Sequence, residues 1–450
     1  MSDCDFKSAG EAGWIAAPLV AVILASALAI PLASNSVQCV VTSPPYWGLR
    51  KYAGSQELVW GGAKRCGHEW SPNGTWKQSP QRDHAPDGSF GATRGVEKSR
   101  AGMAYEASLG NTCLRCDAWR GAFGLEPTVE MYVQHTVEVL REIRRVLRPD
   151  GVVWWNIGDS YAKGGIGIKA KNLCLIPDRV RIAAQEDGWY VRSNIIWNKP
   201  NPMPESVRDR PTDAYEDIIM LTKSGSYCWD QHATMEPTND LKTKPRRFRN
   251  GDASQTLRND EGNSYQPRGT RNPRNVWTFP VGSYKGAHFA TFPVELPLRC
   301  ITATCPSRGC CRFCGTAWKR VMRVTKADEV VTRESVGWTP DCKCRGQRGI
   351  TKPCLVLDPF GGAGTTGLAA GKLKQDCVLL DISGEYCRKM RGRLEGKKHD
   401  KADTEQVEID SGDPLRHPGL PPSCADRGVG IAPPPQRLPA PAGDYLGASL

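Results

Sequence analysis

The chain contains 450 residues, with 60 Lys and Arg against 48 Asp and Glu, so its net charge is +12. Hydrophobic residues make up 39% and charged residues 24%, which excludes a disordered polymer and allows either one large body or two domains. Several of the 18 cysteines stand in close pairs with polar flanks, which favours metal binding in a reducing compartment over the disulfides of a small secreted domain. We therefore expect a cytoplasmic protein with a polyanionic partner.

The first distinctive segment is an uncharged stretch at 14–33 with about the length of a membrane span. Pro18 and Pro31 interrupt it, it is rich in alanine, and acidic residues rather than a basic region precede it. We expect a core strand and helix, or residues that precede the true start, rather than a membrane or signal segment. No membrane partner is expected.

Strands and helices alternate from residue 37 onward. A run of β-branched residues at 37–41 predicts a buried strand that stops at two prolines. After an irregular stretch, apolar residues recur at helical spacing over 127–147, and Pro149-Asp150-Gly151 is expected to end that helix. Further elements are predicted at 152–158 (strand), 176–185 (helix), 189–197, 215–221 and 227–229 (strands). This alternation predicts an α/β sheet.

The strongest ligand-binding signal is the segment LVLDPFGGAGTTGLAAG at 355–371, which predicts a strand, a glycine turn and a helix. Glycines let the backbone approach a ligand, and the N–H groups that begin a helix can bind a carboxylate or phosphate. The next strand ends in Asp381, where an acid can bind ribose hydroxyls. The pattern suits S-adenosylmethionine, although the glycines alone are equally compatible with a structural turn or an NAD site.

A second signal is the turn Ser43-Pro44-Pro45-Tyr46, which follows the strand at 37–41 and is called the proline turn below. The prolines fix the backbone and remove two donors, so both their carbonyls and the Ser43 hydroxyl are left as acceptors. Acceptors beside an aromatic ring suit a planar base with an exocyclic amine. An ordinary turn in a proline-rich linker is the alternative.

Both motifs, in this order, resemble the β group of exocyclic-amino DNA methyltransferases, whose circularly permuted chain places the proline motif before the cofactor motif. The stretches NIGDSYA (156–162), RSNIIWNKPNPMPESVRDRPTDAYE (192–216) and NVWTFPVGSYKGAHFATFPVEL (275–296) also resemble that family. The resemblance covers most of 37–230 and 275–396. It implies a Rossmann-like, circularly permuted sheet of the S-adenosylmethionine-dependent methyltransferases.

Carried over by position, the resemblance assigns catalysis to the proline turn and cofactor binding to the glycine turn and its surroundings. The implied catalytic residues are Ser43, Pro44, Pro45 and Tyr46. The implied cofactor-binding residues are Asp358, Phe360, Gly362, Gly364, Thr365, Thr366, Asp381 and Phe292. Where many relatives carry Gly-Asp-Ala before the catalytic residue, this chain has Ala25-Ser26-Ala27, and the lost carboxylate puts full activity in doubt.

The resemblance, together with periodicity and composition, predicts an organisation of the chain into two halves with insertions. The catalytic half comprises 14–59 and 121–230, and the cofactor-binding half comprises 276–300 and 351–396. A Cys/His insertion at 60–120, a basic target-recognition region at 231–275, a Cys-rich zinc-ribbon-like insertion at 301–350 and a disordered proline-rich tail at 397–450 complete it.

The implied activity is a site-specific methyl transfer from S-adenosylmethionine to double-stranded DNA, by base flipping and direct in-line attack. Serine rather than aspartate at the head of the proline turn is usual among cytosine-N4 enzymes, so we favour cytosine N4 over adenine N6. We expect it to protect DNA in a restriction–modification setting with a cognate endonuclease, or to act alone. From another class, a zinc-stabilised DNA-binding relative without activity is the alternative.

Two groups of cysteines have the spacing of metal ligands. The first cluster is Cys66, His68, Cys113 and Cys116, and the second cluster is Cys311, Cys314, Cys342 and Cys344. Cys305 or Cys310 could replace a ligand in the second set, and free buried cysteines are the alternative for both. We expect structural zinc at both clusters, away from the chemistry.

The basic segment at 231–275 is rich in Lys and Arg that could neutralise DNA phosphates or read guanine edges. The candidate DNA-binding residues are Arg246, Arg247, Arg249, Arg271 and Arg274. A solvated, disordered loop is the alternative.

Overall fold

The computed structural model describes residues 18–48, 56–63, 65–71, 111–164, 168–238, 246–247, 264–265, 269–281, 291–327, 330–344 and 349–396. Contacts divide the chain into residues 1–399 and 400–450. The predicted tail at 397–450, much of the insertion at 60–120 and Arg249 lie outside the described residues.

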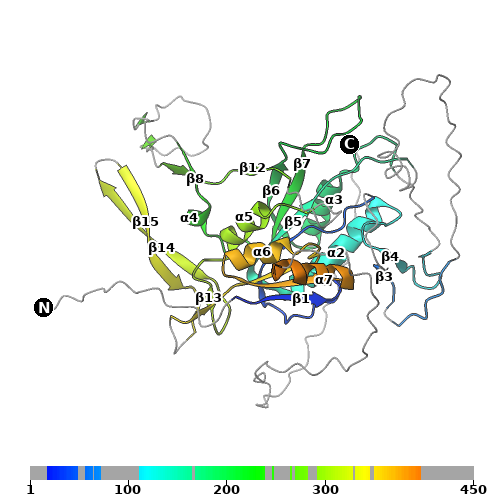
Figure 1. The fold of residues 1–450 in the computed structure, drawn as a ribbon, viewed down its shortest axis with the longest axis horizontal. Coiled ribbons are helices and arrows are strands. Elements are labelled where there is room, and N and C mark those ends of the chain that lie inside the picture. The colour runs from blue at the N-terminus through cyan, green and yellow to red at the C-terminus, as the bar shows by residue number, and fades with distance from the viewer. Residues whose placement is uncertain are drawn as a thin grey trace, which may run out of the picture. The chain divides into compact units, whose positions relative to one another are not determined.

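A sheet of eight strands forms the centre of the first unit, in the order β1-β18-β17-β2-β5-β7-β6-β12 (Figure 1). Strands β1, β18, β17, β2 and β5 run parallel, whereas β7 is antiparallel to both of its neighbours. The strands are β1 (Val20–Leu24), β2 (Val37–Thr42), β5 (Leu147–Ile157), β6 (Tyr190–Asn198), β7 (Tyr215–Thr222), β12 (Val276–Thr278), β17 (Leu355–Asp358) and β18 (Asp376–Asp381). The predicted α/β sheet is confirmed.

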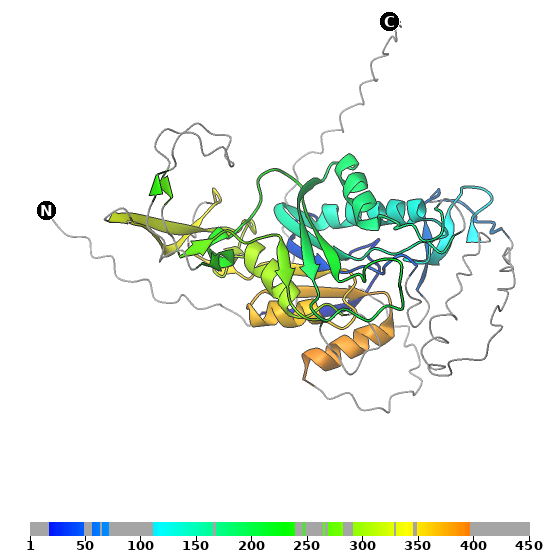
Figure 2. The same cartoon turned by 90° about the horizontal axis from the view of Figure 1, so that it is seen from above.

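Helices cover both faces of this sheet (Figure 2). One face carries α2 (Val129–Val146) and α3 (Ile176–Glu186), and the other carries α5 (Glu295–Thr304), α6 (Thr365–Lys372) and α7 (Gly384–Leu394). The Thr128 side chain caps α2 by accepting a hydrogen bond from the Met131 N–H at 3.2 Å. Because both faces are covered, β2 is buried along its whole length, including the polar residues Gln38 and Thr42.

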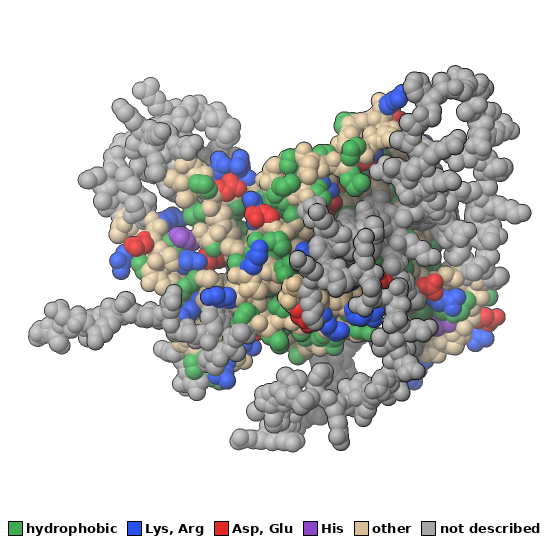
Figure 3. Space-filling view, viewed as in Figure 1, with side chains coloured by type: hydrophobic (Ala, Val, Ile, Leu, Met, Phe, Trp, Pro, Cys, Tyr) green, Lys and Arg blue, Asp and Glu red, His purple; other side chains and the backbone are tan. Residues whose placement is uncertain are grey.

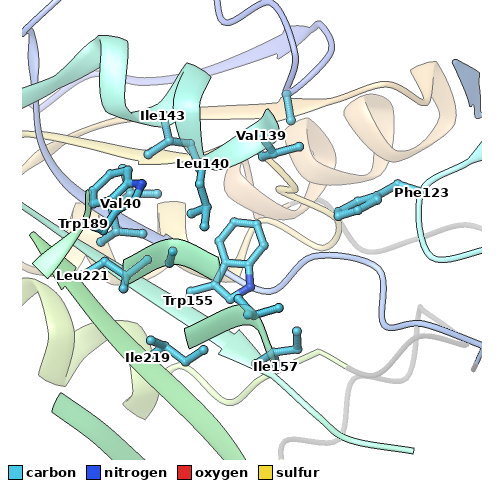
Figure 4. Packing of buried hydrophobic residues seen from close by; sticks show 14 of the residues in the cluster. Val40, Phe123, Val139, Leu140, Ile143, Trp155, Ile157, Trp189, Ile219 and Leu221 are labelled. Atoms are coloured by element: carbon cyan, nitrogen blue, oxygen red, sulfur yellow. The ribbon is translucent and has the colours of Figure 1, made fainter. Parts of the chain in front are cut away.

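The packing on the α2 face is dominated by large side chains from the helix and the central strands (Figure 4). Leu140 and Ile143 of α2 lie in one hydrophobic cluster with Trp155 of β5 and Ile219 of β7. All four side chains are fully buried. Their spacing along α2 is the helical periodicity that predicted the element.

Smaller elements lie outside the central sheet. Two pairs of antiparallel strands, called hairpins below, are β3 (Glu57–Trp60) with β4 (Trp119–Ala122), and β14 (Trp318–Ala327) with β15 (Val330–Pro340). The strands β3 and β4 are far apart in the sequence. The remaining elements are α4 (Gln231–Thr234) and the two-residue strands β8 (Glu236–Pro237), β9 (Arg246–Arg247), β10 (Ser264–Tyr265), β11 (Thr270–Arg271), β13 (Cys310–Cys311) and β16 (Thr351–Lys352).

One predicted helix boundary and one predicted strand were wrong. Helix α2 ends at Val146, before Pro149-Asp150-Gly151, because β5 already begins at Leu147. Residues 148–151 form a bulge in β5 opposite Gln38. Residues 227–229 form no strand, because the Cys228 N–H donates to the Asp150 carbonyl of that bulge at 2.9 Å instead of joining a ladder.

The segment at 14–33 contributes an edge strand, β1, which pairs with β18. The helix expected after that strand is not formed; residues 25–36 make turns. Within the described ranges, none of the helices combines the length and apolarity that crossing a bilayer requires.

Candidate active site

The two predicted motifs meet where the parallel strands end. β2 leads into the proline turn, β17 ends at Asp358 and β18 ends at Asp381, and the carboxyl ends of these strands share one edge of the sheet. A pocket of about 220 Å³ opens at this edge. Its lining includes all four residues of the proline turn and the predicted cofactor-binding residues Phe292, Phe360, Gly362, Thr365 and Asp381.

Asp358 lies beneath the pocket, with 1% of its surface exposed, and joins the two motifs. Its carboxylate accepts hydrogen bonds from the Thr42 and Thr366 hydroxyls, both at 2.7 Å, and from the Phe360 N–H at 3.1 Å. One buried side chain therefore ties the end of β2 to the start of α6. Burial raises the pKa of Asp358 to about 6.

Asp358→Asn is expected to remove a pH-dependent term from stability. Because the pKa of Asp358 rises from 3.8 to about 6 on folding, its ionisation destabilises the native state progressively as pH rises from about 4 to about 6. Asparagine can keep the contacts, since Thr366 can accept from its amide and donate to the Val41 carbonyl at 3.3 Å. We expect the unfolding free energy of the wild type, relative to the variant, to fall by about 3 kcal/mol between pH 4 and pH 7. Denaturant titrations across that range measure the difference, and a pH-independent difference would contradict the assignment.

The glycine turn (residues 359–364) needs glycine at specific positions. Gly362 and Gly364 have φ values of 49° and 74°, which residues with a Cβ rarely adopt. A Cβ at Gly361 would lie 2.7 Å from the Met390 sulfur, so this glycine lets the turn pack on α7. Of the predicted cofactor-binding residues, Asp358, Gly364 and Thr366 do not line the pocket and support it from outside.

Asp381 holds the glycine turn in place and still has acceptor capacity for a ligand. Its Oδ2 accepts from the Gly362 N–H at 3.1 Å, and its Oδ1 accepts from the Ser383 N–H at 2.8 Å. A carboxylate has about four lone-pair sites, so hydroxyls of a bound ribose could still be accommodated. Burial raises the pKa of Asp381.

The proline turn presents fewer free acceptors than expected. The Tyr132 hydroxyl, from α2, donates to the Pro45 carbonyl at 2.9 Å, so that carbonyl fixes the turn to the helix. One of the two lone pairs of the Pro45 carbonyl is therefore used inside the protein, which leaves this carbonyl less acceptor capacity than predicted. The Pro44 carbonyl and the Ser43 hydroxyl are the stronger candidates to accept hydrogens from an amine.

Tyr46 is held by polar side chains that our sequence analysis did not single out. Its hydroxyl donates to Glu216 Oε2 at 2.6 Å and accepts from Asn156 Nδ2 at 2.8 Å, and it also accepts from the Ser43 hydroxyl at 3.1 Å. Lys199 forms an ion pair with the other oxygen of Glu216. These contacts fix the orientation of the Tyr46 ring at the pocket.

The positions of these partners follow from the sheet topology. Asn156 lies near the carboxyl end of β5, and Glu216 lies near the amino end of β7, which runs antiparallel and so begins at the same edge. Among the described residues, Asn156 Oδ1 is buried without a hydrogen-bond partner. It is therefore a further candidate acceptor beside the proline turn.

The substituted stretch Ala25-Ser26-Ala27 also lines the pocket, directly after β1. The Ser26 hydroxyl accepts from the Leu28 N–H at 3.1 Å and so serves the local turn. Because this stretch contains no acidic residue, it brings no carboxylate to the pocket.

Both predicted sets of metal ligands converge, and within each set the ligand atoms lie within 4.8 Å of one another. In the first cluster the Cys66 and Cys113 sulfurs are 3.9 Å apart, close to the separation of about 3.8 Å that tetrahedral Zn–S bonds of about 2.3 Å produce. Burial acts to raise the pKa of Cys113, but hydrogen bonds from the Arg115 N–H and His68 together lower it to about 6, which favours the thiolate that binds metal.

The second cluster excludes the alternative ligands. Cys311, Cys314, Cys342 and Cys344 come together at the base of the β14–β15 hairpin, whereas Cys305 and Cys310 are buried elsewhere. The Cys310 sulfur donates to the Pro353 carbonyl at 3.4 Å. Cys39, Cys174, Cys300 and Cys377 are buried in the core, as predicted.

The basic segment is described only in part. Arg271 and Arg274 both pair with Glu236, at 3.1 and 3.0 Å, while remaining substantially exposed. Arg246 and Arg247 form β9, opposite β10. In the view of Figure 3, Lys and Arg are interspersed with Asp and Glu over the described surface.

Comparison with known proteins supplies a family-level match. A family model for N6/N4 methyltransferases, described as DNA methylase, matches residues 37–316 and 350–391. The type II methyltransferase M.XycI of Xanthomonas campestris pv. cyanopsidis is 29% identical over 389 residues, covering 81% of this chain and 84% of that protein. M.SmaI of Serratia marcescens is 29% identical over 385 residues, covering 81% and 86%. The solved structure of the cytosine-N4-specific PvuII DNA methyltransferase aligns over 85% of this chain and 90% of that one, at 15% identity and a TM-score of 0.44.

Proposed function

The chain belongs to the DNA methylases of the N6/N4 family, and on that premise we propose that it methylates cytosine N4 at specific sites in double-stranded DNA. The observation that carries the proposal is the pocket in which the proline turn and the glycine turn meet. The relatives M.XycI and M.SmaI are type II methyltransferases, which supports a restriction–modification setting with a cognate endonuclease.

S-adenosylmethionine is the proposed cofactor, and it supplies an activated methyl group. Asp381 would bind ribose hydroxyls, the glycine turn would accept the close approach of the ligand, and Phe292 would flank its methionine part. These roles fit a pocket whose lining combines two carboxylates, Asp381 and Glu216, with apolar and glycine surfaces. The cofactor-binding half follows the catalytic half along the chain, as a circular permutation requires.

Catalysis would depend on positioning rather than on a covalent intermediate. The target base must leave the duplex and stack on Tyr46. The Ser43 hydroxyl and the Pro44 carbonyl would then accept its amine hydrogens as the nitrogen becomes tetrahedral, and that nitrogen attacks the methyl group directly. Glu216 and Asn156 would keep the ring and the hydroxyl in place.

Structural zinc at both clusters is part of the proposal. Each set offers four ligands, three thiolates with one imidazole or four thiolates, which leaves no open coordination position. The basic segment and its arginines are proposed to contact DNA phosphates.

The choice of base is tested by expressing the chain in a host without DNA methylation and identifying modified nucleosides by mass spectrometry. We expect N4-methylcytosine. N6-methyladenine would keep the mechanism and overturn the argument from Ser43. If neither modified base is found and the protein still binds S-adenosylmethionine, an inactive DNA-binding relative would replace the proposal, as the missing carboxylate at Ala25-Ser26-Ala27 would suggest.

A further inference from the structure

The first metal cluster is continuous with the β3–β4 hairpin. The Cys113 N–H donates to the Ala118 carbonyl at 2.7 Å, one residue before β4, and Trp119 pairs with Trp60 across the hairpin. At Gly62, just after β3, a Cβ would lie 2.8 Å from the Cys116 sulfur, so this ligand packs directly on the hairpin backbone. A shift of the ligand-bearing turn would therefore displace both strands.

The same hairpin forms one wall of the pocket. Leu58 and Trp60 of β3 and Phe123, directly after β4, line the pocket. The Trp60 and Phe123 ring centroids are 5.1 Å apart, and Phe123 stacks on Phe360 of the glycine turn at 5.7 Å. Figure 4 shows Phe123 at the margin of the buried cluster, where it enters from the turn after β4. Aromatic packing thus links the hairpin to the predicted cofactor turn.

The turn that follows β4 also touches the proline turn. Gly124, with a φ of 89°, accepts a hydrogen bond from the Gly48 N–H at 2.9 Å. A Cβ at Gly124 would lie 3.1 Å from both the Pro45 side chain and the Tyr46 carbonyl. The hairpin and the turn after β4 therefore contact both the proline turn and the glycine turn.

At the end of the hairpin nearest the cluster, Trp60 and Trp119 are buried and stack on His135 of α2, at 4.6 and 5.6 Å, so the hairpin packs on that helix. Its strands have four residues each, and an isolated two-stranded hairpin is marginally stable in water. The two ligand pairs of the cluster are far apart in the sequence, so bringing them together costs chain entropy. A metal ion bound by all four ligands would offset that cost and fix the ligand-bearing turn against the hairpin.

The second cluster provides an internal contrast. Arg148, near the amino end of β5, donates to the Cys314 carbonyl at 2.6 Å. This cluster therefore lies at the opposite edge of the sheet from the pocket. No ligand of either cluster lines the pocket, but the β3–β4 hairpin contributes lining residues whereas the β14–β15 hairpin contributes none.

We propose that metal bound at the first cluster clamps the β3–β4 wall, so that its occupancy controls the affinity of the pocket for its cofactor. The inference rests on the proposed function, which supplies both the zinc and the cofactor. It revises the expectation that both clusters stand apart from the chemistry. Zinc at the second cluster stabilises the chain without affecting the pocket.

The test compares Cys116→Ser with Cys344→Ser as a matched control. Zinc content is measured by atomic absorption, folding by circular dichroism and thermal melting, and affinity by calorimetry with S-adenosylhomocysteine as probe. We expect two zinc ions in the wild type and one in each variant. Cys116→Ser should bind the probe at least about 10-fold more weakly, and Cys344→Ser should bind it within about twofold of the wild type.

A second measurement covers the case in which Cys116→Ser does not fold. Coupling between two sites is reciprocal, so the probe should tighten zinc binding at the first cluster by the same factor. This is measured in Cys344→Ser, which retains only that site, by competition with a chromogenic chelator with and without saturating S-adenosylhomocysteine. Unchanged zinc affinity would overturn the proposal.

The outcomes separate this inference from the proposed function. If the wild type binds two zinc ions but not the probe, the proposed cofactor is wrong and the coupling fails with it. If the wild type binds both, and Cys116→Ser loses its zinc yet keeps full affinity for the probe, only the clamp is wrong.

Discussion

Replacing Tyr46 with alanine should lower kcat for methyl transfer by about 10³-fold and leave the Kd for S-adenosylmethionine within about twofold. The Tyr46 ring would be the surface on which the target base stacks, and its hydroxyl is fixed by contacts at 2.6 Å to Glu216 and 2.8 Å to Asn156. Without the ring, the base would lose its orientation relative to the Ser43 hydroxyl. The buried connections of the glycine turn do not pass through Tyr46, so cofactor binding should persist.

Single-turnover methylation of a DNA substrate, with cofactor binding measured separately by calorimetry, checks this expectation. Tyr46→Phe is the matched control, because it keeps the ring and removes only the hydroxyl contacts; a loss of about 10-fold is expected for it. Ser43→Ala should behave like Tyr46→Ala, since it removes a proposed acceptor. Turnover at the wild-type rate in Tyr46→Ala would show that the proline turn does not hold the target base.

The parts of the site that could be predicted from sequence are those carried by contiguous motifs. The proline turn and the glycine turn each follow a buried strand, and parallel strands place their carboxyl ends at one edge, so local pattern suffices to bring Ser43 and Asp381 to the same pocket. The convergence of the two cysteine clusters was predictable for a similar reason, because paired cysteines on polar loops are typical of metal ligands.

The residues that were missed depend on long-range pairing. Glu216 reaches Tyr46 only because β7 runs antiparallel and begins where β5 ends, and the direction of a strand is not visible in its apolar pattern. Tyr132 donates to the Pro45 carbonyl from a helix that the periodicity predicts as a whole, without showing which of its side chains contacts the turn. The bulge at 148–151 likewise requires the partner strand that carries Gln38.

The role of the first insertion was also beyond local pattern. Its ligand spacing predicts a metal site, but the sequence does not show that Trp60 and Phe123 on either side of the insertion turn toward the glycine turn. That requires β3 and β4 to pair across the long segment between them. The hairpin next to the first cluster thus lines the pocket in the fold, although none of the four cluster residues does.

Asp381→Ala is expected to raise the Kd for S-adenosylmethionine by about 10- to 100-fold, because a charge-assisted hydrogen bond to a ligand contributes about 1.5–3 kcal/mol. The change removes the proposed ribose acceptor and also the contact with the Gly362 N–H at 3.1 Å. Asp381→Asn separates these two effects. Its carbonyl oxygen can still accept from one backbone N–H, so the glycine turn should keep its shape while the charged acceptor is lost.

Calorimetry with S-adenosylmethionine and with methionine alone distinguishes the two sources of affinity. If Asp381 binds the ribose, both variants should lose affinity for the whole cofactor, and Asp381→Asn should bind methionine as the wild type does. If Asp381→Asn instead keeps full affinity for the cofactor and only Asp381→Ala weakens it, the carboxylate acts on the turn and not on the ligand. The acid at the end of β18 would then be a support for Gly362, and the ribose would have to be bound by other groups of the pocket.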